Sequence, residues 1–184
     1  MKQENTRTIW PFIEWTEIVD EENVKEIIVK EEIILGEDVV GNMGEITKVE
    51  IFSSLFKPNS LFIKGEKLVG ITAENKAREY FYYALFENAH VNERKTLHIR
   101  IKGEATEKLI REGGYHSNFA WSSKHIQRIV FPKKCKILSA IPRGYVVSVF
   151  KGKPSITWTR NEKFWGAVKV NVLFEEFKIN STSS

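Results

Sequence analysis

Residues 145–160 read YVVSVFKGKPSITWTR, in which two runs rich in β-branched and aromatic residues flank a Lys151-Gly152 pair. Such residues favour strands, and a two-residue connection containing glycine is typical of a β-hairpin. With Lys151-Gly152 as the loop, the facing pairs are Tyr145–Trp158, Val147–Ile156, Ser148–Ser155 and Val146–Thr157. The first two pairs share one face and the last two share the other. The stretch therefore predicts a hairpin whose aromatic pair packs in the core, with base stacking as the alternative use of these rings.

The same half of the chain contains three further runs with strand-like composition. These are IQRIVF (126–131), CKILSA (135–140) and AVKVNVLF (167–174). In the last run Val168, Val170 and Val172 alternate with polar residues, which indicates a strand with one buried and one solvent-facing side. Together with the hairpin, these runs predict a curved antiparallel sheet or a partly closed barrel.

The first hundred residues contain more strand-like runs. These are KVEIFSS (48–54), SLFIKG (60–65), KLVGIT (67–72) and TLHIRIK (96–102). Residues 24–35 combine Ile and Val clusters with regularly spaced charges, so they predict either a strand or a short helix. Residues 7–18 also favour a strand, but Pro11 lacks a backbone N–H and predicts an edge or entry position.

Two segments have the features of helices. Residues 73–90 follow Thr72, a favourable N-cap residue, and Glu74 and Arg78 are spaced for an i,i+4 ion pair. Residues 104–112 end at a pair of glycines, and glycine commonly follows the C-terminus of a helix. We therefore predict a single α+β domain in which one or two helices pack on the sheet.

No linker-like or repetitive segment divides the 184 residues. This predicts one domain over residues 1–179 and a disordered polar tail over residues 180–184. The single cysteine, Cys135, excludes an intramolecular disulfide and is expected to be a small buried apolar side chain. Without a signal-like N-terminus or a long apolar run, the sequence favours a cytoplasmic protein with no membrane segment.

Charge is distributed unevenly along the chain. Residues 1–92 carry 10 basic and 17 acidic residues, whereas residues 93–184 carry 18 basic and 7 acidic residues. The domain therefore has an acidic first half and a basic, β-rich second half over residues 93–179.

The region from Gly113 to Asn161 has no Asp or Glu, although it contains many cations and aromatic rings. Its nine basic residues are Lys124, Arg128, Lys133, Lys134, Lys136, Arg143, Lys151, Lys153 and Arg160. A folded segment with charge of one sign and interleaved rings suits a polyanion, and nucleic acid is the commonest one in a cell. Trp121 lies in a polar, loop-like context and is the best candidate for stacking on a base. We predict a non-enzymatic protein that binds nucleic acid or another polyanion, mainly through the lysines of two turns.

Two alternatives remain open. The first is a metal-independent ribonuclease in which His125 or His116 acts as acid or base beside nearby Lys and Arg side chains. The second is a protein-interaction module whose oppositely charged halves bind an acidic partner or each other in a homodimer. No motif for a cofactor or metal is present: the histidines and Cys135 lack the short paired spacings of a zinc site, so neither is predicted.

Overall fold

The computed structural model describes residues 7–21, 23–42, 45–105, 110–111, 114–118, 124–161 and 167–174. Fourteen β-strands joined by turns and short loops make up this part of the chain, and it contains no helix. Accordingly, nothing in it resembles a helix long and apolar enough to cross a membrane. The strands form three sheets of seven, four and three strands.

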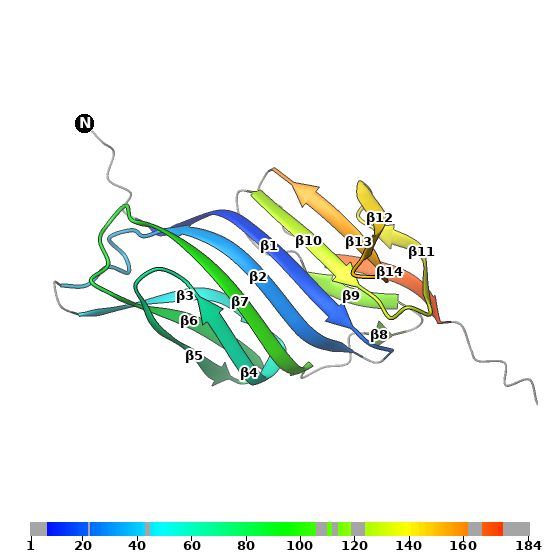
Figure 1. Cartoon of the computed structure of the whole chain (residues 1–184), viewed down its shortest axis with the longest axis horizontal. Coiled ribbons are helices and arrows are strands. Elements are labelled where there is room, and N and C mark those ends of the chain that lie inside the picture. The colour runs from blue at the N-terminus through cyan, green and yellow to red at the C-terminus, as the bar shows by residue number, and fades with distance from the viewer. Residues whose placement is uncertain are drawn as a thin grey trace, which may run out of the picture.

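The largest sheet, called sheet A, runs along the length of the molecule (Figure 1). Its order from edge to edge is β12 (Tyr145–Phe150), β13 (Lys153–Arg160), β10 (Lys124–Val130), β1 (Ile9–Val19), β2 (Val24–Ile34), β7 (Arg94–Ala105) and β4 (Phe56–Lys64). Neighbouring strands are antiparallel except β1 and β10, which are parallel. This parallel pair joins the N-terminal strands of the sheet to the C-terminal ones.

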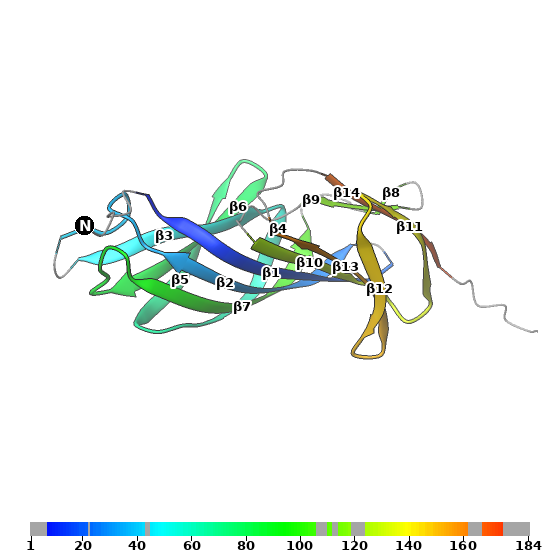
Figure 2. The ribbon, with the colours of Figure 1, turned by 90° about the horizontal axis from the view of Figure 1, so that it is seen from above.

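Two smaller sheets lie against one face of sheet A (Figures 1 and 2). Sheet B has the order β3 (Ile46–Ser54), β6 (Glu79–Glu87) and β5 (Leu68–Lys76), and sheet C has the order β11 (Cys135–Ile141), β14 (Ala167–Phe174), β9 (Gly114–Asn118) and β8 (Ile110–Arg111). Trp15 of β1 meets Phe52 of β3 with ring centroids 5.1 Å apart, which links sheet A to sheet B. Tyr115 of β9 donates a hydrogen bond to Glu17 of β1, which links sheet A to sheet C. The molecule is therefore a β-sandwich in which two short sheets share one face of a long one.

Side-chain alternation explains why sheet A has one buried and one solvent-facing side. Along β7, Leu97, Ile99 and Ile101 are buried while the residues between them are exposed. On the solvent side, ion pairs join β2 to β7, namely Glu32–Arg94 and Glu26–Arg100. The period of two thus sorts apolar residues toward sheets B and C and charged residues toward water.

The hairpin predicted over residues 145–160 is confirmed in both its loop and its register. All four predicted facing pairs occur between β12 and β13. Lys151 and Gly152 have φ values of 49° and 75°, and two positive φ values define a type I′ turn. Trp158 is fully buried and meets the Tyr145 ring edge-on at 6.0 Å, so these rings pack in the core.

The other predicted strands are also present, with shifts at their ends. Residues 24–35 resolve as a strand, β2, rather than as a short helix. β1 is central, however, and not the edge strand predicted from Pro11. Pro11 falls where the register with β2 shifts, between Ile9 and Phe12, and pairing with β10 begins only at Phe12. The missing N–H of proline is tolerated because it falls outside the regular ladder.

The helix predicted over residues 73–90 is wrong. This segment completes β5, turns at Ala77-Arg78 and then forms β6. Tyr82, Ala84 and Phe86 are fully buried at a spacing of two residues, which only a strand provides. β6 pairs with β3 on one side and with β5 on the other. This cross-strand pairing of aromatic side chains outweighs the local cap and ion-pair signals for a helix.

The helix predicted over residues 104–112 is wrong wherever it can be compared with the structure. Glu104 and Ala105 end β7, and Ile110–Arg111 form β8. Residues 106–109 and 112 lie outside the described part of the chain, as does the predicted tail over residues 180–184. The fold class is therefore all-β rather than α+β, and three sheets replace the predicted curved sheet or barrel.

Gly103 of β7 lies where the backbone of β4 approaches most closely. A Cβ atom on Gly103 would lie 1.9 Å from the carbonyl oxygen of Lys57, beside a register shift at Pro58. We predict that Gly103→Ala lowers the free energy of unfolding by about 1–3 kcal/mol, because the backbone must move. Chemical denaturation measures this loss. Gly70→Ala, where no atom lies within 4 Å, is the matched control, and equal stability of the two variants would contradict the prediction.

Glu31 of β2 is a buried carboxyl group on the core side of sheet A, opposite Ile13 and Leu97. Neither oxygen has a hydrogen-bond partner among the described residues, and burial raises the pKa of Glu31 well above its usual value. Above pH ~4.3, the usual Glu pKa, the unfolded chain ionises while the folded chain resists ionisation, so stability falls as pH rises.

We predict that Glu31→Leu stabilises the protein by about 1–3 kcal/mol at pH 7, because an unpaired polar group leaves the core. The free energy of unfolding of the variant should also decline less between pH 5 and pH 8 than that of the unmodified protein. Thermal unfolding measured over this pH range tests both effects, and Glu32→Leu on the solvent side of the same strand is the control. A destabilised Glu31→Leu variant at pH 7 would refute this account.

Candidate functional site

Two lysine-bearing turns lie side by side at one end of sheet A. The first is the β10–β11 turn, which Cys135 N closes by donating to the Pro132 carbonyl at 3.0 Å. The second is the type I′ turn between β12 and β13. Phe131 N donates to the Pro154 carbonyl at 2.8 Å, so one backbone hydrogen bond holds the two turns together. In Figure 2 both turns project to the same side of the molecule.

These turns and the first residues of the adjoining strands carry a group of lysines, here called the lysine end. Its members are Lys133, Lys134, Lys136, Lys151 and Lys153. All are exposed except Lys153, which is half-buried. Lys133, Lys136 and Lys153 form no ion pair with any residue that the structure describes. The lysine end thus brings five positively charged side chains together on two neighbouring turns.

Arg128 lies on the solvent side of β10 and is compensated by the acidic first half of the chain. Its guanidinium binds the Glu14 carboxylate at 3.0 Å and contacts the Thr16 hydroxyl at 3.4 Å. It also stacks 4.9 Å from the centre of the Phe150 ring. This arrangement makes Arg128 part of the sheet surface rather than a free cation.

The three remaining predicted cations lie at the opposite end of the same strands. Lys124 begins β10, and Arg160 ends β13 opposite His125. Arg160 donates to the Arg143 carbonyl at 2.9 Å. Since β10 has seven residues, these cations lie roughly 20 Å from the lysine end along the strand direction. Trp121, the predicted stacking residue, lies outside the described part of the chain.

The two histidines proposed for a ribonuclease lie in different surroundings. His125 is fully buried between sheets A and C, and this burial, with the neighbouring Arg160, lowers the pKa of the imidazole. A fully buried imidazole is poorly placed to act as acid or base on an RNA phosphate. His116 is half-buried on β9 opposite Lys169 of β14, far in register from the two turns. Of these two alternative residues, only His116 is partly exposed to solvent.

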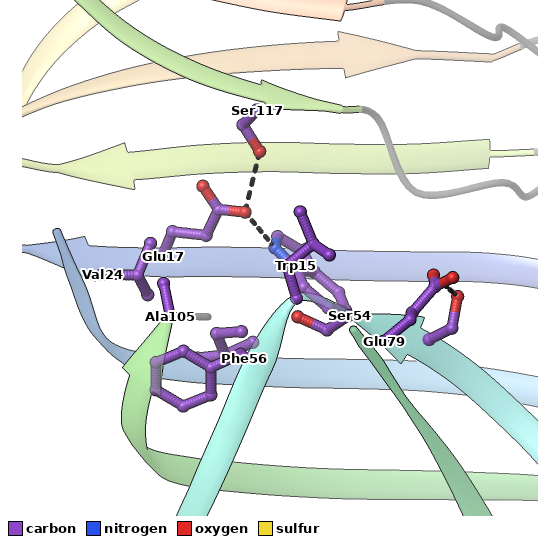
Figure 3. Close-up of a pocket in the computed structure, with 11 residues that line it drawn as sticks. Trp15, Glu17, Val24, Ser54, Phe56, Glu79, Ala105 and Ser117 are labelled. Carbon is purple, nitrogen blue, oxygen red and sulfur yellow. Dashed lines mark hydrogen bonds between the residues drawn. The ribbon is translucent and has the colours of Figure 1, made fainter. Parts of the chain in front are cut away.

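A cavity of ≈ 150 Å³ lies where the three sheets meet (Figure 3). Apolar side chains such as Phe56 line the cavity. Its polar groups are the indole N–H of Trp15, the carboxyl groups of Glu17 and Glu79, and the hydroxyl groups of Ser53 and Ser117. Glu79 accepts a hydrogen bond of 2.5 Å from Ser53 on the sheet B side. Neither here nor elsewhere in the described residues could a group of three His, Cys, Asp or Glu side chains hold a metal ion.

Glu17 is buried at the wall of this cavity and accepts three hydrogen bonds. Its Oε1 accepts from Trp15 Nε1 and Ser117 Oγ, both at 2.9 Å, and its Oε2 accepts from the Tyr115 hydroxyl. Burial raises the pKa of Glu17, and these donors act in the opposite direction. Our sequence analysis did not single out Glu17. The sequence does show that Glu17 follows Trp15 by two residues. In a strand this spacing places both side chains on the same side, here the core side of β1.

Cys135, the single cysteine of the chain, lies at the start of β11 and is buried, as predicted. Burial raises the pKa of its thiol to about 11, so the thiol stays protonated near neutral pH. It contributes packing and no reactive group.

No protein-family model matches the chain, and no curated protein sequence is similar enough to count as a match. Solved structures do share its fold. A mutant M1 zinc metallopeptidase from Deinococcus radiodurans bound to a Tyr-Ser-Ala substrate matches with a TM-score of 0.55 and 10% identity, over 90% of this chain and 42% of that one. Aminopeptidase A of Legionella pneumophila, in complex with aspartic acid, matches with a TM-score of 0.51 and 10% identity, over 92% of this chain and 22% of that one. The present chain thus spans less than half the length of these proteins, and the likeness establishes the fold alone.

We predict that Glu17→Gln lowers the free energy of unfolding by about 1.5–3 kcal/mol, because an amide cannot accept all three charge-assisted hydrogen bonds. Tyr115→Phe should cost less when Glu17 is already replaced, so a double-mutant cycle should show coupling between the two residues. Glu79→Gln, across the same cavity, is the control and should change stability by less than about 0.5 kcal/mol. Additive effects of the Glu17 and Tyr115 substitutions would argue against the bridge.

Proposed function

We propose that the chain is a non-catalytic module that binds a polyanion, nucleic acid in the first place, through the lysine end. The observation that carries this proposal is the hydrogen bond from Phe131 N to the Pro154 carbonyl, which holds two lysine-bearing turns side by side. Segments about twenty residues apart in sequence thereby contribute to one surface. Residues 113–161 themselves contain no acid that could compensate these lysines.

The physical basis of such binding is the release of counterions from the ligand. Lysines on exposed turns reach phosphates without desolvating other groups, and each phosphate contact adds to the salt dependence of binding. Five contacts to a single strand would give a slope of log K against log salt of about −3.5. Contacts from lysine side chains to phosphates carry no base information, so the proposed binding has little sequence preference.

Protein binding is a second candidate, favoured by exposed valines on strand β12 that are described below. In the solved structures named above, a part similar to this chain belongs to a longer protein, which suits a module that works beside other domains. Docking through oppositely charged halves is less well supported, because the acids and bases of sheet A interleave. Glu14–Arg128, Glu26–Arg100 and Glu32–Arg94 are all neighbours across strands.

The proposal predicts salt-dependent binding of a short single-stranded RNA or DNA, measured by fluorescence anisotropy between 50 and 200 mM NaCl. The Lys133→Gln/Lys151→Gln variant should weaken binding at 50 mM salt and reduce the magnitude of the salt slope by about 1.5, because two phosphate contacts are lost.

Lys57→Gln/Lys64→Gln is the matched control, because it removes two exposed lysines at the far edge of sheet A. This control should leave affinity and slope close to those of the unmodified chain. Equal losses in the two variants would mean that net charge alone governs binding. Absence of binding at 50 mM salt would reject the proposal.

A further inference from the structure

Strand β12 is the outermost strand of sheet A, and its outer edge has no strand partner among the described residues. The hairpin that it forms with β13 projects from the body of the molecule, as Figure 2 shows. An exposed edge offers a row of unpaired N–H and C=O groups to an incoming strand. The question is whether this edge has the features that proteins use to prevent such pairing.

The type I′ turn determines which backbone groups of β12 point outward. A two-residue loop makes Phe150 and Lys153 a hydrogen-bonded pair, and such pairs alternate with non-hydrogen-bonded ones along an antiparallel ladder. The N–H and C=O groups of Tyr145, Val147 and Val149 therefore point away from β13. The Phe131–Pro154 hydrogen bond agrees with this phase, since the Pro154 carbonyl points to β10 and away from β12.

The valines of β12 are exposed on both sides of the strand. Val146, Val147 and Val149 are 64%, 54% and 75% exposed. β12 contains no charged residue, no proline and no shift in its register with β13. Three exposed valines within four residues, on an edge without a strand partner among the described residues, are an interaction surface or an aggregation hazard.

The opposite edge of the same sheet, strand β4, has features that prevent pairing with another strand. β4 contains Pro58, begins and ends near Lys57 and Lys64, and has a register shift between Pro58 and Ser60. Proline, lysine and bulges are the devices that block edge pairing. Sheet A therefore has one protected edge and one edge open to pairing.

Charge at the two ends of β12 indicates the chemistry of a partner. Exposed Arg143 precedes the strand and exposed Lys151 follows it, and the surrounding segment has no acids. We propose that β12 binds an extended segment of another protein, which adds to sheet A as an eighth strand. This partner strand has apolar residues at alternate positions and acidic residues at both ends, a mode known as β-augmentation.

A second copy of the chain suits this edge less well. Antiparallel pairing of two β12 strands about a two-fold axis would bring Lys151 of each copy beside Arg143 of the other. Like charges at both ends of a short strand pair oppose association. The acidic strand has the opposite effect, since it neutralises both ends.

This inference does not rest on nucleic-acid binding, because it depends on the backbone edge of β12 and the charges of Arg143 and Lys151 at its ends, and not on the grouping of all five lysines. Val147→Pro separates the two proposals. It removes an outward-pointing N–H without removing a hydrogen bond to β13, and should leave oligonucleotide binding unchanged while weakening strand binding.

The test uses the full chain and a labelled peptide, acetyl-EETVTVTEE-amide, with KKTVTVTKK and EETPTPTEE as control peptides. Fluorescence titration should show binding of the acidic peptide and at least tenfold weaker binding of both controls. Amide hydrogen exchange read by NMR should show new protection at Tyr145, Val147 and Val149. Val146 and Ser148, whose amides point to β13, should not change.

Val147→Pro and Val149→Lys should each weaken peptide binding at least tenfold, and circular dichroism and NMR spectra will show whether they keep the fold. Val69→Lys is the matched control, since Val69 is 53% exposed on β5 in another sheet. Lack of acidic-peptide binding, or equal binding of all three peptides, overturns the proposal. Concentration-dependent protection of the same amides without peptide also overturns it, in favour of a second copy.

Discussion

One face of sheet A has to be covered by two separate short sheets, and the rest of the structure depends on how they meet there. The described strands of sheets B and C do not pair with one another, so each sheet is held mainly by burial against sheet A. Sheet B is fixed by aromatic contacts, with Phe52 between Trp15 and Tyr82. Sheet C is fixed in part by the carboxylate of Glu17, which accepts hydrogen bonds from Tyr115 and Ser117. A buried carboxylate is costly unless its oxygens are paired, so Glu17 fixes where β9 can lie.

The surfaces that we connect with function lie where sheets B and C no longer cover sheet A. β12 extends beyond the strands that sheet C buries, which leaves its valines exposed and its outer edge without a strand partner in the described part of the chain. The neighbouring turns carry the lysine end, whereas the middle of the solvent face of sheet A is a mixture of paired charges such as Glu14–Arg128. Five of the nine predicted cations are therefore grouped at one end of the sheet, although the basic residues are spread along half the chain.

The helix predicted over residues 73–90 illustrates how local signals fail. Thr72, Glu74 and Arg78 satisfy the rules for capping and i,i+4 pairing, yet the adjacent aromatic residues would surround a helix on every side. The run Tyr80–Phe86 fits a strand, because a period of two places Tyr82, Ala84 and Phe86 in the core together. The structural role of Glu17 was not predicted from the sequence for a related reason. Its partners Tyr115 and Ser117 lie about a hundred residues away, and no local pattern connects them.

The sequence by itself determined the hairpin over residues 145–160, most strands of the second half and the acid-free stretch of cations, because these depend on neighbouring residues and on a period of two. Only the tertiary structure decided which strands are central, that β1 lies parallel to β10, that His125 is buried, and which five of the nine cations gather at one end. Such decisions depend on contacts between distant segments. Burial and hydrogen bonding across sheets select among arrangements that local propensity leaves nearly equal in free energy.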